Sequence, residues 1–239
     1  MSEKKKIKQQ EEEKGFETIE ETLSRTEQFI EKNQKILSYI VIGILVVVAG
    51  YMGVKKYYIL PHRVEAQSQM FGAVNYFERD SFNLALNGDG SFLGFNDIID
   101  EYGNTPAGNL AHYYAGISNL RLGNFDEAIS QLQSFSSDDL MISTMALGAI
   151  GDAYSELNDN EEAVSYYVKA VENNPNDFTT PIFLFKAGLM YEILGDWENA
   201  LKYYKRIETE YPKSKEARDI QKYITRARIK LGLPVNDEI

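Results

Sequence analysis

The longest apolar stretch of the chain covers residues 36–54, ILSYIVIGILVVVAGYMGV, and lies between Lys35 and Lys55. It contains no charged residue, and as a helix that rises about 1.5 Å per residue it would nearly cross the roughly 30 Å hydrocarbon core of a bilayer. A lone strand in lipid would leave its backbone groups unpaired, so the pattern predicts one transmembrane helix. A buried core helix or a buried parallel strand is the alternative, although neither usually runs this long without a polar residue.

Two patterns precede this stretch. Residues 1–15 are polar and charged, and we expect them to be disordered. From Phe16 onward apolar residues recur every three or four positions, which predicts an amphipathic juxtamembrane helix over residues 16–35. Thr26 and Asn33 interrupt the apolar stripe. This helix is therefore either a simple extension of the membrane helix or a docking surface for another membrane subunit.

Three later segments share one pattern. They begin at Ala111, Ala146 and Phe183, and small residues recur in them at two positions, 35 and then 37 residues apart. Polar turns divide each segment in two, and tyrosines follow the small residues in the second and third segments. The spacing predicts pairs of antiparallel helices that approach closely at the small residues, with aromatic rings filling the gaps between neighbouring pairs. The predicted packing residues are Gly116, Ala128, Gly151, Tyr154, Ala163, Tyr167, Gly188, Tyr191, Trp197, Ala200 and Tyr204.

Further helical patterns flank the three segments. Pro61 is expected to separate the apolar stretch from a helix over residues 63–79, whose partner helix is interrupted by a loop at residues 87–91. If the repeated helix pairs stack into a solenoid, a polar helix must cover the last face of the stack. The basic C-terminal stretch suits that role. The alternative for that stretch is a contact patch for anionic headgroups or an acidic partner. The predicted parts are a divergent first hairpin at 57–104, three repeats at 105–212, a capping helix at 213–232 and a tail at 233–239.

Composition excludes several classes of function. The net charge is −11, and the excess of acids lies after residue 57, which argues against a general nucleic-acid binder because phosphate contacts need clustered cations. With no cysteine and two histidines, zinc sites of the usual kinds cannot form. The turn at residues 87–90 offers one carboxylate, too few for calcium. No phosphate-binding glycine loop or nucleophile elbow occurs, so we expect no enzyme activity, cofactor, metal or small-molecule substrate.

The repeat pattern resembles the tetratricopeptide repeat (TPR), most closely in GDWENALKYYKRIETEYP. The resemblance implies an all-α solenoid with about three clear repeats, whose first helices line a concave surface that binds protein partners. The residues that it places in this groove are mostly apolar, which suits an amphipathic helix or an unfolded segment. Asp152 and Glu192 are the exceptions, and a solvated or hydrogen-bonded acid is the simpler interpretation of Asp152. The implied groove residues are Leu110, Tyr113, Ile117, Leu120, Met145, Asp152, Ile182, Phe185, Leu189 and Glu192.

The whole layout resembles the YfgM-type ancillary subunits of the bacterial Sec translocon. That resemblance implies a single-pass protein of the inner membrane with a cytoplasmic N-terminus and a periplasmic TPR domain. Its partners would be translocon subunits, a periplasmic chaperone or unfolded clients, and its role would be chaperone-like. The segments EYGNTPAGNLA and EYPKSKEARDI resemble outer-membrane assembly TPR proteins instead. They imply a structural scaffold of an envelope complex without a client-chaperone role.

Charge alone gives only weak evidence for the orientation of the apolar helix in a membrane. Cations near the apolar stretch are equally many on its two sides, so the positive-inside rule gives no local answer. Lysines in the first fourteen residues favour an N-terminus on the cytoplasmic side. The neighbouring cations are Arg25, Lys32 and Lys35 before the stretch and Lys55, Lys56 and Arg63 after it.

Overall fold

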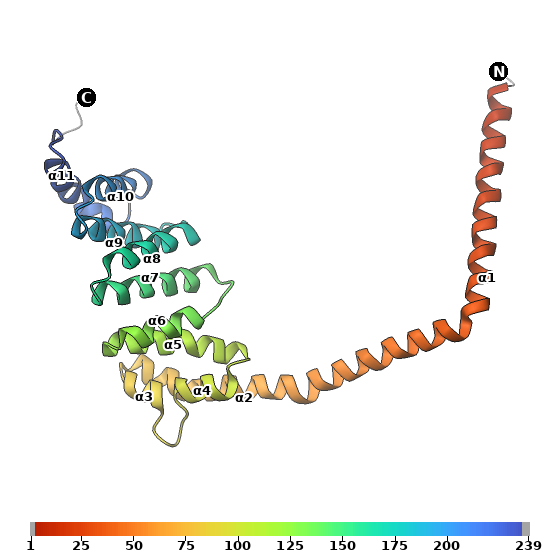
Figure 1. Cartoon of the computed structure of the whole chain (residues 1–239), viewed down its shortest axis with the longest axis horizontal. Coiled ribbons are helices and arrows are strands. Elements are labelled where there is room, and N and C mark those ends of the chain that lie inside the picture. Colours follow the sequence, from red (N-terminus) through yellow and green to blue (C-terminus); the bar gives the residue numbers. More distant parts are fainter. Residues whose placement is uncertain (1–2, 236–239) are drawn as a thin grey trace. The chain divides into compact units, whose positions relative to one another are not determined.

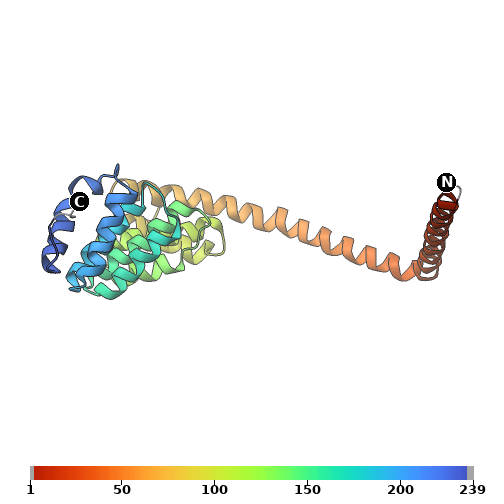
Figure 2. The same ribbon diagram turned by 90° about the horizontal axis from the view of Figure 1, so that it is seen from above.

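The computed structural model describes residues 3–235, with side chains from residue 29 onward. Every regular element in this range is a helix, which confirms the predicted all-α fold. The chain forms two compact units, residues 1–61 and residues 62–239. In the second unit, helical hairpins stack in sequence order into a solenoid (Figures 1 and 2).

Helix α1, Glu3–Val54, makes up most of the first unit. The structure thus differs from the expected disorder of residues 1–15, since the helix already begins at Glu3. This stretch is rich in Glu, Lys and Gln, which are among the stronger helix formers. Residues 1–2 and most of the expected tail lie outside the described part, and so do the side chains of the apolar stripe up to residue 28.

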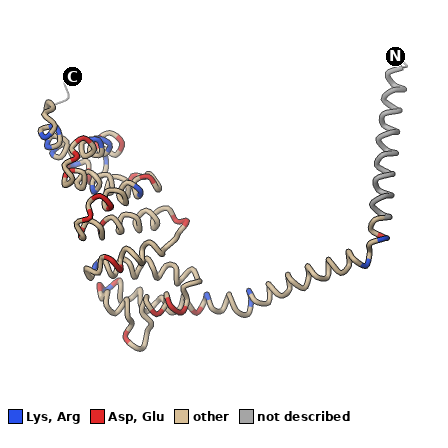
Figure 3. The backbone as a smooth tube through the Cα atoms, viewed as in Figure 1, with Lys and Arg blue, Asp and Glu red and all other residues tan. Residues whose placement is uncertain are grey.

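Residues 36–54 carry no charge in the second half of α1 (Figure 3). Their apolar side chains are exposed in this structure: Ile36 is 60% exposed and Val47 71%. By length and composition this helix is able to cross a membrane, and none of its most apolar window is buried. Exposing so much contiguous apolar surface to water is unfavourable, so a bilayer or a partner is needed to cover it.

Pro61 does not end the helical run as expected. A π-helical turn at Lys55–Ile59 precedes it, and Pro61 is the second residue of α2, Leu60–Glu78. The backbone N–H of Leu60 donates to the carbonyl of Lys55, five residues back. Proline has no N–H to close a normal helical turn, and a widened turn is one way in which a helix accommodates it.

The second unit contains four helical hairpins and a final helix. In the first hairpin, a loop at residues 88–94 splits the second helix into two short ones, near the loop expected at residues 87–91. The hairpins that follow are regular, and each helix packs against the next in the sequence. The elements are α3 (Phe82–Asn87), α4 (Phe95–Tyr102), α5 (Pro106–Leu122), α6 (Phe125–Ser134), α7 (Leu140–Glu156), α8 (Asn160–Asn173), α9 (Thr180–Ile193), α10 (Trp197–Glu210), η2 (Glu216–Asp219) and α11 (Ile220–Lys230).

Close approach of the two helices in a hairpin depends on the recurring glycines. A Cβ atom added at Gly151 would lie 2.7 Å from the ring of Tyr167, and one at Gly188 would lie 2.4 Å from the ring of Tyr204. In the first regular hairpin the neighbour of the equivalent glycine is a leucine. The recurring alanines of the second helices are fully buried at the same interfaces: Ala128, Ala163 and Ala200.

The other predicted packing aromatics contact residues near their own hairpins. Tyr154 stacks on Tyr166 at 5.5 Å between ring centroids, and the rings of Tyr191 and Tyr203 lie 5.2 Å apart. Each pair joins the two helices of one hairpin rather than neighbouring hairpins. Trp197 is half-buried, and a lysine ammonium of α11 lies 5.4 Å from its ring centroid.

The C-terminal stretch is not the single helix that we expected at 213–232. A 3₁₀ turn, η2, precedes α11, and the hydroxyl of Ser214 accepts a hydrogen bond from the N–H of Ala217 at 3.1 Å. Ile220 and Ile224 of α11 are buried in the same core as Tyr204 of α10. α11 therefore takes the place that the first helix of a further hairpin would occupy.

Candidate protein-binding groove

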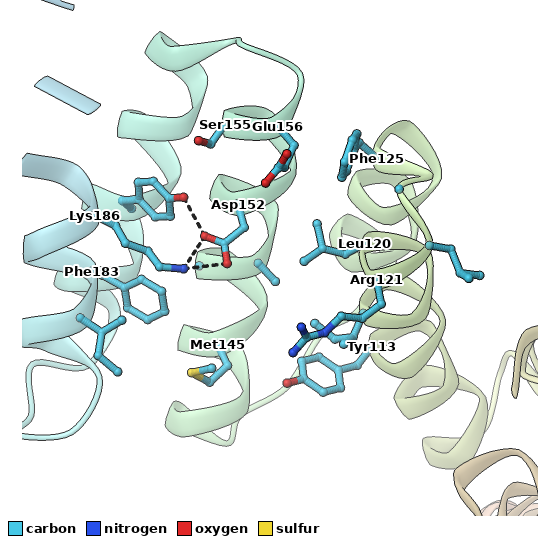
Figure 4. Close-up of a pocket in the computed structure, with 17 residues that line it drawn as sticks. Tyr113, Leu120, Arg121, Phe125, Met145, Asp152, Ser155, Glu156, Phe183 and Lys186 are labelled. Atoms are coloured by element: carbon cyan, nitrogen blue, oxygen red, sulfur yellow. Dashed lines mark hydrogen bonds and ion pairs between the residues drawn. The ribbon is translucent and has the colours of Figure 1, made fainter. Parts of the chain in front are cut away.

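A hollow of about 900 Å³ runs along α7, and α5 and α9 form its two sides (Figure 4). Its floor comes from one face of α7, because residues three or four positions apart lie on the same side of a helix. We call this hollow the α7 groove. Its main lining residues are Met145, Gly148, Asp152, Ser155 and Glu156 on α7, Tyr113, Ile117, Leu120 and Arg121 on α5, Phe125 on α6, Tyr167 on α8, and Ile182, Phe183 and Lys186 on α9.

Gly148 allows α9 to approach the floor of the groove. A Cβ atom at this position would lie 2.0 Å from the ring of Phe183, which is itself only 2% exposed. Phe183 also stacks on Tyr167, with ring centroids 6.3 Å apart. The two rings fill the interior behind the groove and expose almost none of their surface to it.

A single carboxylate organises the polar part of the groove. Asp152 accepts hydrogen bonds from the ammonium of Lys186 at 2.6 and 2.7 Å and from the hydroxyl of Tyr167 at 2.7 Å. Burial, with the nearby charge of Asp152 adding to it, raises the pKa of Tyr167, so its hydroxyl stays protonated and donates. The Lys186 ammonium also lies 5.6 Å from the Tyr167 ring centroid and 5.9 Å from that of Phe183. Asp152 thus ties α7 to α8 and α9.

Six residues that the repeat resemblance implies as binding residues line the α7 groove. Their role in binding stays a prediction. They are Tyr113, Ile117, Leu120, Met145, Asp152 and Ile182. Leu110 lies instead in a neighbouring apolar hollow of about 430 Å³ between α2 and α5, where it meets Met70, Val74 and Tyr114.

Phe185, Leu189 and Glu192 lie outside the α7 groove because α11 packs over this end of α9. The ring of Phe185 meets that of Tyr223 edge-on at 4.8 Å between centroids. Glu192 pairs with Arg226 of α11 at 2.8 Å. The capping helix was expected on the last face of the solenoid, and not over these residues.

Sequence reasoning did not select Phe183, Lys186 or Arg121. Phe183 and Lys186 flank the implied residues on α9, so a small rotation of the assumed helix face explains the omission. Lys186 did carry a usable signal, since it is the single charged residue in the apolar run PIFLFKAGLMY. Its partner Asp152 lies on another helix, and pairing between helices cannot be read from spacing within one of them.

The remaining polar candidates have local partners. Asp89, in the turn considered for calcium, accepts hydrogen bonds from the hydroxyl of Tyr76 at 2.7 Å and from two backbone N–H groups. These bonds, that from Tyr76 first, lower the pKa of Asp89. His112 lies 2.7 Å from the amide oxygen of Gln131. Within the described residues, no group of three or more His, Cys, Asp or Glu side chains is placed to hold a metal ion.

Comparison with family models places three tetratricopeptide repeats in the chain. One model of the tetratricopeptide repeat matches residues 146–177, and another matches residues 110–138 and 183–214. These are the three regular hairpins. The chain therefore contains tetratricopeptide repeats, as the spacing of its small residues predicted.

Solved structures show the same kind of solenoid. The TPR-like repeats of a kinesin light chain from Podosopora anserina match with a TM-score of 0.52 at 14% identity, over 72% of this chain and 88% of that one. A point variant of the same repeats matches with a TM-score of 0.53 at the same identity and coverage. At this identity the likeness shows the fold alone. No curated protein sequence matches the chain.

Proposed function

We propose that this chain is a membrane-anchored protein-binding module in which the α7 groove holds a segment of a partner protein. The observation that carries the proposal is the groove itself, which is open, lined by both apolar and polar side chains, and formed by the first helices of three consecutive repeats. Repeats of this type present extended concave surfaces for binding. The exposed apolar run at residues 36–54 would provide the anchor.

In its finer form, the proposal is a chaperone-like accessory of the Sec translocon in the bacterial inner membrane, with the repeats on the periplasmic side. Translocon subunits, a periplasmic chaperone or translocated clients would occupy the groove. The order of the parts supports this role: a charged N-terminal segment, one apolar helix and a repeat domain. The apolar residues along the groove suit a segment that exposes hydrophobic side chains before it folds.

Site-specific crosslinking in membranes tests this function. A photoreactive residue in place of Met145, which lines the groove and is 41% exposed, should form adducts with translocon subunits or with chains that are being translocated. The matched control is the same residue in place of Glu172, which is exposed on α8 away from the groove. Equal labelling from both positions, or adducts with unrelated cytosolic proteins alone, would contradict the proposal.

A structural scaffold of an envelope complex is the second candidate function. One observation favours it: α11 packs against Phe185 and Glu192, which makes the apolar surface shorter than a site for many clients would be. Full-length protein in nanodiscs distinguishes the two candidates. A chaperone-like protein should delay the aggregation of a denatured model substrate, whereas a scaffold should fail to do so and still copurify with one stoichiometric partner.

A further inference from the structure

One cation of the α7 groove lacks a partner among the side chains that the structure describes. Arg121, near the end of α5, lines the groove, and it makes no hydrogen bond or ion pair with any residue whose side chain is described. In Figure 4 its guanidinium reaches toward Tyr113 and Met145 rather than away from the groove. A bound partner that covers these two residues would also cover Arg121.

The acidic side chains of the groove do not pair with Arg121. Both oxygens of Asp152 are engaged by Lys186, and one of them also by Tyr167. Glu156 lies beside Ser155 at the other end of the floor in Figure 4 and makes no hydrogen bond or ion pair with the described side chains. Within the described part of the chain, the groove therefore carries a closed ion pair, an unpaired acid at its rim and an unpaired cation among apolar residues.

Covering an unpaired guanidinium with an apolar surface is costly, because the charge loses its water without gaining an acceptor. A carboxylate on the partner removes this cost, and it can accept two parallel hydrogen bonds from arginine. Building on the proposed function of the groove, we infer that its partner segment is an amphipathic helix with one acidic residue within its apolar face, and that this carboxylate pairs with Arg121.

The shape of the groove agrees with a helical occupant. The floor runs along α7 from Met145 to Ser155, eleven residues that span about 15 Å. A helix laid in such a groove makes contacts through residues three, four and seven positions apart over about three turns. The apolar residues of the ligand would face Tyr113, Met145 and Ile182, and its carboxylate would lie on the side of α5.

Binding of designed peptides to the full-length chain in detergent tests the inference. Three peptides of about 18 residues share one apolar helical face and differ only at its centre, which is Glu, Gln or Lys. Fluorescence anisotropy should show that the Glu peptide binds about tenfold more tightly than the Gln peptide, as expected for a charged pair that becomes buried. The advantage should shrink as salt is raised.

Two variants and one control make the test specific. Arg121→Gln should remove the preference for Glu and keep the affinity for the Gln peptide, and Arg121→Glu should shift the preference to the Lys peptide. Arg218→Gln, at an arginine of η2 outside the groove, should change nothing. Equal binding of the Glu and Gln peptides to the unaltered chain would overturn the inference and leave the groove function standing. Binding of none of the three would contradict both.

Discussion

Position 188 allows no side chain, because its neighbour cannot move away. The ring of Tyr204 is fully buried, and its hydroxyl donates to Glu192 at 2.9 Å. The same arrangement recurs one hairpin earlier, where Tyr167 lies against Gly151 and donates to Asp152. The sequence predicted this packing of glycines and tyrosines, since the small and aromatic residues recur in it with a regular period. The ion pairs that those tyrosines join were not visible, because they link different helices.

Gly188→Ala should therefore destabilise the protein. An added methyl group gains about 0.5–1 kcal/mol in helix propensity, but overpacking against a fixed ring costs about 1–3 kcal/mol. We expect a net loss of about 1–2 kcal/mol in the free energy of unfolding, measured by urea denaturation in detergent. Gly53→Ala, where no atom lies within 4 Å of the added group, is the matched control. Equal stability of both variants would show that the close approach is not needed.

Alkaline pH should weaken the repeat domain through its buried tyrosines. Burial, followed by the influence of Tyr191, raises the pKa of Tyr203 from 10.0 to about 12. The unfolded chain then releases this proton at a lower pH than the folded chain does, so stability is complete below pH 10 and falls as the pH rises through 12. Urea denaturation at several pH values should show this fall. Tyr203→Phe should make it shallower, and stability that rises over this interval would contradict the account.

At the scale of elements, α11 decides where the concave surface ends. Its two buried isoleucines extend the core of the last hairpin, and Arg226 pairs with Glu192 of α9. The sequence predicted a polar capping helix, but it did not predict that this helix also covers part of the concave face. The reason is physical. The residues that pack against α9 lie more than thirty positions later in the chain, and a local sequence pattern cannot predict such a contact.

A chain that stops after Pro212 should lose this cover. The buried surface of Tyr204 and the apolar ring of Phe185 would become exposed, because both rings pack against Tyr223 of α11. We expect a lower unfolding temperature for the repeat domain and a tendency to aggregate. A chain that stops after Leu231 keeps α11 and should behave like the full protein. An unchanged unfolding temperature of the shorter chain would show that α11 adds nothing to the solenoid.

At the scale of the whole molecule, the apolar helix and the repeat domain are distinct compact units. Both were predictable, because a 19-residue uncharged run and a repeating period are signals that need no tertiary context. The helical state of the charged segment from Glu3 and the π-helical turn before Pro61 were not predicted. In both cases a helix continues where a local rule predicted disorder or a break.

Deleting residues 36–54 should release the chain from membranes. The full chain should resist extraction by alkaline carbonate, and a variant whose 19 residues are replaced by leucines should resist it equally, since each retains a run long enough to span the hydrocarbon core. Recovery of the deletion variant in the membrane pellet would show that another part of the molecule holds it there. A topology reporter fused after Ile239 would establish the side on which the repeats lie.

Quantitative affinity isolation in mild detergent shows whether a partner protein binds in the α7 groove. Mass spectrometry would compare the unaltered chain, Met145→Arg in the groove, and Glu172→Arg on the exposed face of α8. We expect the groove variant to recover about tenfold less of a defined partner, since a buried charge without a counter-ion costs more than about 1.4 kcal/mol, and the α8 variant to retain that partner. Equal recovery of the same partners with all three chains would contradict binding in the groove.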